Sequence, residues 1–297
     1  MLENDIIEIP MLWGHFLPKM GLAVISGNSD TGKSTLMRQL SSAIVTGQEQ
    51  YLGLPLRTVN NNVIYVCTED DVTSISSRLK KEFDGISSTD PYDNLRYIFE
   101  EDDVYENLEA ELKRKPADCV IIDALGDIFQ GDMNNMTSVR SFFKPYKSLA
   151  SSNNCLIILV AHNRKSANEN AGKADVLGSQ AFEAKPRAVL MLSQVSGSPL
   201  KELRISKGNF VSEEVKKIKL SLQINAEGMF EVSVPSFGFS ADMSQGEKYF
   251  DRIIELKEEK LSSRNIASIL TAEGKKIGKS KVAEILKERI RKDDKIV

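Results

Sequence analysis

Residues 27–35 have the sequence Gly-Asn-Ser-Asp-Thr-Gly-Lys-Ser-Thr and fit the pattern G-x-x-x-x-G-K-[ST] at every fixed position. An apolar run, residues 21–26, precedes this stretch, and a helix-forming segment, residues 35–40, follows it. A glycine-rich turn from strand to helix points backbone N–H groups at one spot, where the positive end of the helix dipole also lies. This feature predicts an α/β fold with a phosphate-binding loop.

The residue types in the loop indicate a nucleoside triphosphate, expected to be ATP, with Mg²⁺. Lys33 is expected to reach the β- and γ-phosphates, and the Ser34 hydroxyl is expected to hold the Mg²⁺ ion. The predicted nucleotide-binding residues are Gly27, Asn28, Ser29, Asp30, Thr31, Gly32, Lys33, Ser34 and Thr35.

Composition limits the class of protein. The chain has 297 residues, 41% hydrophobic and 27% charged, which is typical of one large globular domain with a small appendage. No apolar run approaches the roughly 20 residues that cross a bilayer, and the acidic start lacks the features of a signal peptide. Cys67, Cys119 and Cys155 lie in or beside apolar runs, so they are predicted to be buried thiols of a cytoplasmic protein.

Apolar runs then alternate with helical patterns. Four short runs are continuously apolar: residues 63–67, 119–122, 156–160 and 189–192. With helices predicted over 72–83 and 139–149, they indicate a parallel sheet that helices cover on both faces. After residue 200 the pattern alternates between apolar and polar, as in half-exposed antiparallel strands at residues 203–206, 218–222 and 229–232.

The chain is predicted to divide into two domains. The α/β domain covers residues 1–235, a linker covers 236–246, and a small all-α domain that resembles a helix-turn-helix covers 247–297. Residues 245–297 carry 14 Lys and Arg against 10 Asp and Glu, whereas the whole chain has a net charge of −3. A basic tail is a mild indication of nucleic-acid contact, although on charge alone a soluble helical tail is the better explanation.

Carboxylates follow two of the predicted strands. Asp123 ends the run 120–122 and is expected to position Mg²⁺. Glu69 follows the run 63–67 and is the candidate general base for hydrolysis, with Asp70 as the alternative. The acidic residues 69–71 could also cap the next helix, since carboxylates favour helix N-termini.

His162 also ends a predicted buried strand, where it could sense the γ-phosphate, although a lone histidine at a strand end is more often structural. In this order, the segments GNSDTGKST, VIYVCTEDD, CVIIDALGDIF, LIILVAHNRK, LGSQAFEAKPRAVLML and LRISKGN resemble the RecA-like ATPases. Within them, the chain over roughly residues 10–235 is most similar to the plasmid RepA-type hexameric replicative helicases.

The resemblance implies specific roles. It assigns Glu69 as the general base, Asp123 as the Walker-B aspartate and His162 as the strand-end histidine. It also implies that basic residues reach the γ-phosphate of a neighbouring subunit, and Arg187 and Lys207 match such positions. Many ring helicases carry a second basic residue where this chain has Asn209, so Arg187 is the stronger candidate. A structural role for Arg187 beside the strand that follows it is the alternative.

The resemblance further implies that the polar segment 163–178 faces a channel and grips single-stranded DNA through Arg164, Lys165 and Lys173. Residues 131–135 are a second candidate channel loop, although a plain surface loop explains them equally well. In the tail, Lys279, Ser280, Lys281 and Lys287 would face duplex DNA if the helices form a helix-turn-helix, although such helix pairs also dock proteins.

Three functions fit these features. The first is an ATP-hydrolysing homo-oligomer, expected to be a hexameric ring, that moves on single-stranded DNA in replication. The second is an ATP-dependent regulatory switch that binds duplex DNA, and the third is a recombinase-like filament ATPase. The sequence does not distinguish a ring from a filament.

Overall fold

The computed structural model describes residues 9–82, 93–99, 102–132, 134–163, 185–233, 256–257, 261–272, 278–279 and 282. The chain forms two compact units, Met1–Gly238 and Phe239–Val297. The predicted linker, residues 236–246, lies outside the described residues.

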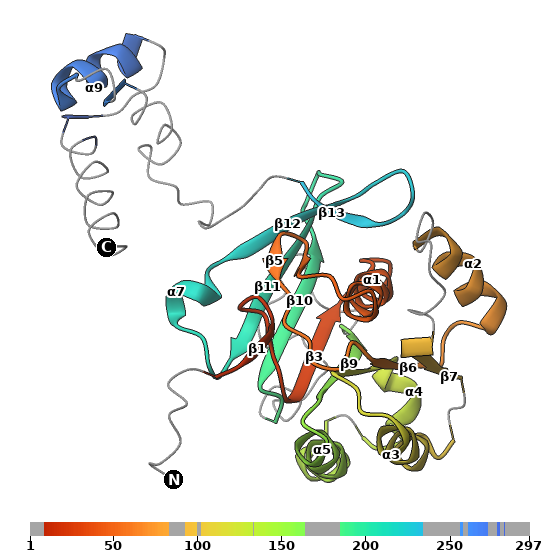
Figure 1. Ribbon diagram of the computed structural model, residues 1–297. Coiled ribbons are helices and arrows are strands. Elements are labelled where there is room, and N and C mark those ends of the chain that lie inside the picture. The colour runs from red at the N-terminus through yellow and green to blue at the C-terminus, as the bar shows by residue number, and fades with distance from the viewer. Residues whose placement is uncertain are drawn as a thin grey trace. The chain divides into compact units, whose positions relative to one another are not determined.

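The first unit is built on one large mixed sheet (Figure 1). Within the described residues it has nine strands, and its spatial order is β13 (Phe230–Val232), β12 (Lys219–Ile224), β11 (Lys201–Gly208), β10 (Ala188–Gln194), β3 (Gly21–Gly27), β9 (Leu156–His162), β8 (Cys119–Asp123), β6 (Val63–Cys67) and β7 (Leu95–Ile98). The strands from β10 to β7 pair in parallel, and β11, β12 and β13 add an antiparallel edge. The predicted parallel sheet with an antiparallel edge is confirmed.

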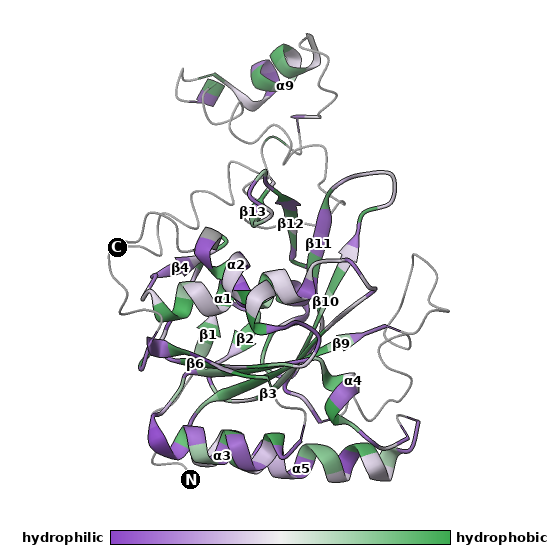
Figure 2. Cartoon of the chain, turned by 90° about the vertical axis from the view of Figure 1, so that its right-hand side faces the viewer, coloured by the Kyte–Doolittle hydropathy of each residue, from purple (hydrophilic) through white to green (hydrophobic). Residues whose placement is uncertain are grey.

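Helices cover both faces of this sheet (Figure 2). The helices of the first unit are α1 (Lys33–Val45), α2 (Val72–Glu82), α3 (Val104–Arg114), α4 (Leu125–Ile128), α5 (Met136–Ser152) and α7 (Glu213–Lys216). The side chains of Ala23 and Ile25 join the core cluster that contains α1, whereas Leu22 and Val24 join the cluster that contains α3 and α5. Successive residues of a strand point to opposite faces of the sheet, and both faces are covered by helices. The residues on both faces must therefore be apolar, and this explains the continuous apolar runs.

Several elements were not predicted from the sequence. They include β7, α3 and the small two-stranded pairs β1 (Met11–Trp13) with β2 (Leu17–Pro18) and β4 (Gln50–Tyr51) with β5 (Leu54–Pro55). The short strands are held partly by one aromatic group, since the indole of Trp13 donates a hydrogen bond to the Tyr51 carbonyl at 2.9 Å and stacks on Phe16. Contacts of this kind carry no periodic sequence signal.

Helix α5 begins three residues earlier than the predicted helix 139–149. The Asn135 side chain accepts hydrogen bonds from the backbone N–H groups of Thr137 and Ser138, which is the geometry of a helix N-cap. Asn135 belongs to the candidate loop 131–135, so at least this side chain has a structural use.

The described part of the second unit contains α9 (Ser263–Ala272), within the predicted helical tail. Ile266 and Leu270 pack with Leu256 and Val282 in a small core. Lys279 is described as helical and exposed, whereas Ser280, Lys281 and Lys287 lie outside the described residues. In the part of the chain that is described, no helix is long and apolar enough to span a membrane. The three cysteines are buried free thiols, as predicted.

The phosphate-binding loop begins at Gly27, the last residue of β3, where there is no room for a side chain. A Cβ atom on Gly27 would lie 2.3 Å from the backbone oxygen of Leu192 in the neighbouring strand β10. We therefore expect Gly27→Ala to push the two strands apart and to lower the free energy of unfolding by about 1–3 kcal/mol, measured by urea denaturation without nucleotide. Gly126→Ala is the matched control, because nothing lies within 4 Å of a Cβ at that helical position, and equal losses for both variants would contradict the expectation.

Candidate functional site

The phosphate-binding loop lies between β3 and α1, at the edge of the sheet where the parallel strands end (Figure 1). Asp30 and Gly32 adopt left-handed backbone conformations with φ of 61° and 92°, which turn the chain from the strand into the helix. The Thr31 hydroxyl closes the turn by donating a hydrogen bond to the Asn28 carbonyl at 2.9 Å. The loop thus has the local geometry that its sequence predicts.

Lys33 is the central cation of the site and is only 4% exposed. Its ammonium group donates a hydrogen bond to the Asn28 carbonyl at 2.9 Å and contacts Nδ1 of His162 at 3.3 Å. Burial lowers the pKa of Lys33, and the negative charges of Asp123, Glu69 and Asp30 oppose that shift. The ammonium group is therefore held between the loop and the end of β9.

His162 connects Lys33 to the candidate base. Its Nε2 atom lies 3.2 Å from Oε1 of Glu69. An ammonium group can only donate and an ionised carboxylate can only accept, so the two contacts together require a neutral imidazole with its hydrogen on Nε2. Glu69 and His162 keep 46% and 40% of their side chains exposed, which leaves the carboxylate accessible to water. The structure brings these three predicted residues into one hydrogen-bonded row.

Asp123 lies beside this row and is buried, with 3% exposure. Burial raises the pKa of its carboxyl group, while hydrogen bonds from Tyr65 and Ser34 oppose the rise. Oδ2 accepts a hydrogen bond from the Tyr65 hydroxyl at 2.7 Å. The pKa of Tyr65 is raised well above its usual value, chiefly by burial, so the phenol stays protonated and donates.

The same residues fit a magnesium ion. Among the described residues, no side chain or backbone group makes a hydrogen bond of normal geometry to Oδ1 of Asp123, although this oxygen is fully buried. A buried carboxylate oxygen without a donor is suited to a hard cation, and Ser34 lies close enough to supply a second oxygen. A bound Mg²⁺ would neutralise phosphate charge, and Asp123 and Ser34 would hold it.

The acidic residues after β6 have separate partners. Asp71 caps α2, since its Oδ1 accepts from the backbone N–H groups of Thr73 and Ser74 at 2.7 and 2.9 Å. These hydrogen bonds lower the pKa of Asp71. Asp70 pairs with Arg78 on α2. Glu69 alone of the three contacts His162, which supports it over Asp70 as the candidate base.

Some residues near the loop were not found from the sequence. The ring of Phe230 on β13 occupies the space beside Gly32, where a Cβ would lie 2.7 Å from the ring. The backbone of Phe230 is held to α1 by Gln39, whose Oε1 accepts from its N–H at 2.8 Å. Lys201 at the start of β11 donates to the Asp30 carbonyl at 3.4 Å. Tertiary contacts of this kind, which join segments far apart in the sequence, have no local signature.

Arg187 and Lys207 lie at the opposite edge of the sheet, where the parallel strands begin. The Arg187 side chain lies against Gly21, the first residue of β3, and its guanidinium group stacks over Phe210 at 5.2 Å. Lys207 donates to the Pro186 carbonyl at 3.1 Å in the same corner. The six residue steps along β3 from Gly21 to Gly27 span about 20 Å, so Arg187 does not reach the phosphate loop of its own chain.

The predicted DNA-binding residues of the first unit belong to the segment that follows β9. Arg164, Lys165 and Lys173 lie outside the described residues. Lys279 is described, but its neighbour Lys281 is not. These DNA contacts stay predictions.

A model of the AAA domain family matches residues 4–168, more than half of the 297 residues. The chain belongs to this AAA-domain family. The match includes the phosphate loop, Glu69, Asp123 and His162. With the fold described above, it identifies the chain as a RecA-like P-loop ATPase.

The matches to individual proteins have low sequence identity. The DNA repair protein RadA of Chlamydia pneumoniae is 26% identical over 220 residues, covering 72% of this chain and 42% of that protein. RadA of Bacillus subtilis (strain 168) is 23% identical over 249 residues, covering 82% of this chain and 48% of that protein. The chain thus spans less than half the length of these relatives.

The crystal structure of the RadB recombinase matches with a TM-score of 0.51 and 13% identity, over 74% of this chain and 93% of that chain. At this identity the likeness shows the shared RecA-like fold. None of these matches is to a RepA-type helicase, so the narrower resemblance to that family stays a prediction.

The Tyr65–Asp123 hydrogen bond gives a pH-dependent prediction. Tyr65→Phe removes the donor to a buried carboxylate, so we expect the free energy of unfolding to fall by about 1–3 kcal/mol at neutral pH. Burial places the folded-state pKa of Asp123 above its usual 3.8, and a buried carboxylate takes up a proton as the pH falls through that pKa. The loss should therefore shrink on acidification toward pH 3.8.

The measurement is urea denaturation of both proteins at stepwise lower pH, repeated in an Asp123→Asn background. Without a carboxylate at position 123, the cost of Tyr65→Phe should no longer depend on pH over this range. A cost with the same pH dependence in both backgrounds would show that Tyr65 acts through packing instead.

Proposed function

We propose that this protein is an ATPase that assembles from identical subunits on single-stranded DNA, in the manner of a recombinase. The observation that carries the proposal is the hydrogen-bonded row of Lys33, His162 and Glu69 at the phosphate loop. It offers a cation for the phosphates and, next to it, a water-accessible carboxylate.

Each residue of the row has a definite task in this proposal. Lys33 binds the β- and γ-phosphates, and Glu69 accepts a proton from the attacking water. His162, which touches both side chains, responds when the γ-phosphate takes its place beside Lys33. Since His162 is the last residue of β9, that response would pass directly into the segment with Arg164, Lys165 and Lys173.

The names of the relatives favour DNA repair or recombination over replicative unwinding. The RadA relatives are named as DNA repair proteins, and the structural match is titled a recombinase. We therefore place the recombinase-like function first, and a ring helicase becomes the second candidate. Unwinding of a duplex is the property that separates them.

Conversion of Glu69 to Gln tests the base. The amide keeps the shape of the side chain but cannot take the proton from water, so we expect ATP turnover to fall by about 10²–10⁴-fold while ATP binding persists. Steady-state phosphate release and equilibrium binding of a fluorescent ATP analogue measure the two properties. Lys33→Ala is the control that should lose both, and Asp70→Asn should stay near the wild-type rate. Normal turnover by Glu69→Gln would rule out Glu69 as the base.

The DNA part is tested by the ATPase rate with and without single-stranded and duplex DNA. We expect single strands to stimulate turnover and, with ATP, to nucleate filaments visible by negative-stain electron microscopy. Closed rings that displace a strand from a forked duplex would support the helicase. Stimulation by duplex alone would point to a duplex-binding regulatory switch, and a rate indifferent to DNA would contradict any DNA-dependent function.

Arg187 is proposed to complete the site of a neighbouring subunit, because it lies at the edge of the sheet opposite its own phosphate loop. Arg187→Ala and Lys33→Ala should each be nearly inactive alone. In a 1:1 mixture, about a quarter of the sites would pair an intact loop from one variant with an intact arginine from the other. We expect the mixture to recover activity toward that fraction.

The phosphate-release rate of the mixture, followed after the subunits have exchanged, measures this recovery. Lys207→Ala serves as the comparison, because it removes a positive charge from the same edge of the sheet. Full activity of Arg187→Ala alone, or no recovery on mixing, would contradict a role across the interface.

A further inference from the structure

One exposed face of α5 is strongly basic, although the chain as a whole has a net charge of −3. The helix Met136–Ser152 contains Arg140, Lys144 and Lys147 and has no Asp or Glu. Spacings of four and three residues place these cations on one side of the helix, at intervals of about 5–6 Å. All three residues are exposed.

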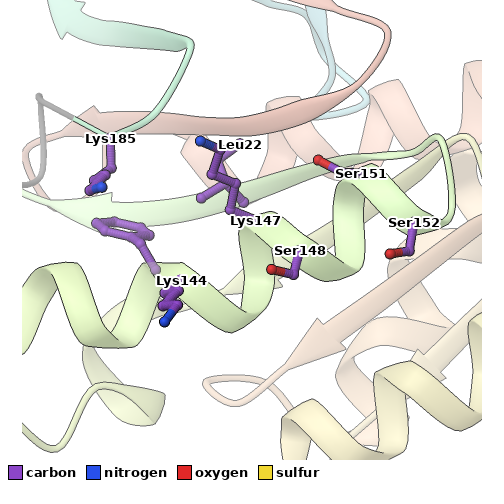
Figure 3. A pocket seen from close by; sticks show the side chains of 8 residues that line it. Leu22, Lys144, Lys147, Ser148, Ser151, Ser152 and Lys185 are labelled. Carbon is purple, nitrogen blue, oxygen red and sulfur yellow. The ribbon is translucent and has the colours of Figure 1, made fainter.

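A hollow of about 500 Å³ lies beside this face (Figure 3). Lys144, Lys147 and three serines of α5 line one side, and Lys185, from the segment that leads into β10, extends toward the helix from the other. Within the described residues, no carboxylate lines the hollow and none of its three lysines forms an ion pair. The hollow therefore offers three ammonium groups and three hydroxyl groups with no counter-charge among those residues. The serines are Ser148, Ser151 and Ser152.

We propose that this hollow binds the phosphate backbone of single-stranded DNA. The inference rests on the proposed function and adds a contact surface on α5 to the segment already expected to touch DNA. Lys185 is the first described residue after 164–184, the stretch that contains Arg164, Lys165 and Lys173.

The chemistry of the lining favours the backbone over the bases. Ammonium and hydroxyl groups donate hydrogen bonds to phosphate oxygens, whereas stacking of bases needs an open aromatic face. The one ring in the lining, Phe143, is 1% exposed and belongs to the core. The hollow is therefore expected to bind without sequence preference and with strong salt dependence.

The test is the affinity for a labelled oligodeoxythymidine, measured by fluorescence anisotropy at several salt concentrations. The variant Lys144→Ala/Lys147→Ala/Lys185→Ala should bind more weakly than the wild type. The slope of log K against log salt should become shallower by about 2, because each phosphate contact with a single strand contributes about 0.7. The melting temperature checks that the variant is folded.

A matched control removes the same charge elsewhere. Lys80→Ala/Lys113→Ala/Lys219→Ala deletes three exposed lysines from α2, α3 and β12, and its slope should stay at the wild-type value. Equal losses of affinity and equal changes of slope in the two triple variants would show that only the net charge matters. That result would overturn the proposal.

Two further outcomes separate this inference from the proposed function. If the lysine variant keeps the wild-type slope and single strands still stimulate its ATPase activity, the hollow is not a DNA surface and the proposed function stands. If the wild type itself does not bind the oligonucleotide, both fail. Displacement of the oligonucleotide by polyglutamate at matched charge would favour an acidic protein partner and would also overturn the inference.

Discussion

The rest of the site depends on how the buried ammonium group of Lys33 is stabilised. Removing a charge from water is costly unless opposite charges and hydrogen bonds replace the hydration. Here the Asn28 carbonyl, His162 and the charges of Glu69 and Asp123 take over that task. Each comes from a different strand end, so the position of the ammonium group depends on the alignment of β3, β6, β8 and β9.

The sheet registers provide that alignment. Gly27 of β3 lies opposite His162 of β9, and Cys67 of β6 lies opposite Asp123 of β8. Thr68 joins the last two strands, since its backbone N–H donates to the Asp123 carbonyl at 2.8 Å. The Ala124 N–H donates back to the Thr68 hydroxyl at 2.9 Å. The next residue, Glu69, is thereby held over the end of β8, within reach of His162.

Much of this arrangement could be predicted from the sequence, for a physical reason. The central strands are buried on both faces, so they must be continuously apolar, and polar residues directly after them must lie at one edge of the sheet. That reasoning found Glu69, Asp123 and His162, whereas Lys33 was found from the pattern G-x-x-x-x-G-K-[ST]. It missed α3 and β7. The apolar pattern of β7 is weak, because Arg96 and Tyr97 are only half-buried. It also missed Tyr65, whose role depends on the register between β6 and β8.

The antiparallel edge of the sheet contacts the phosphate loop directly. The ring of Phe230 packs where a side chain at Gly32 would lie, and Gln39 of α1 holds the Phe230 backbone through its N–H and carbonyl groups. Glycine at position 32 thus serves two needs, the left-handed turn of the loop and the close approach of this ring. Strand β13 ends at Val232, at the last described residues before the second unit. The ring of Phe230 therefore joins the phosphate loop to β13, the last described strand of the first unit.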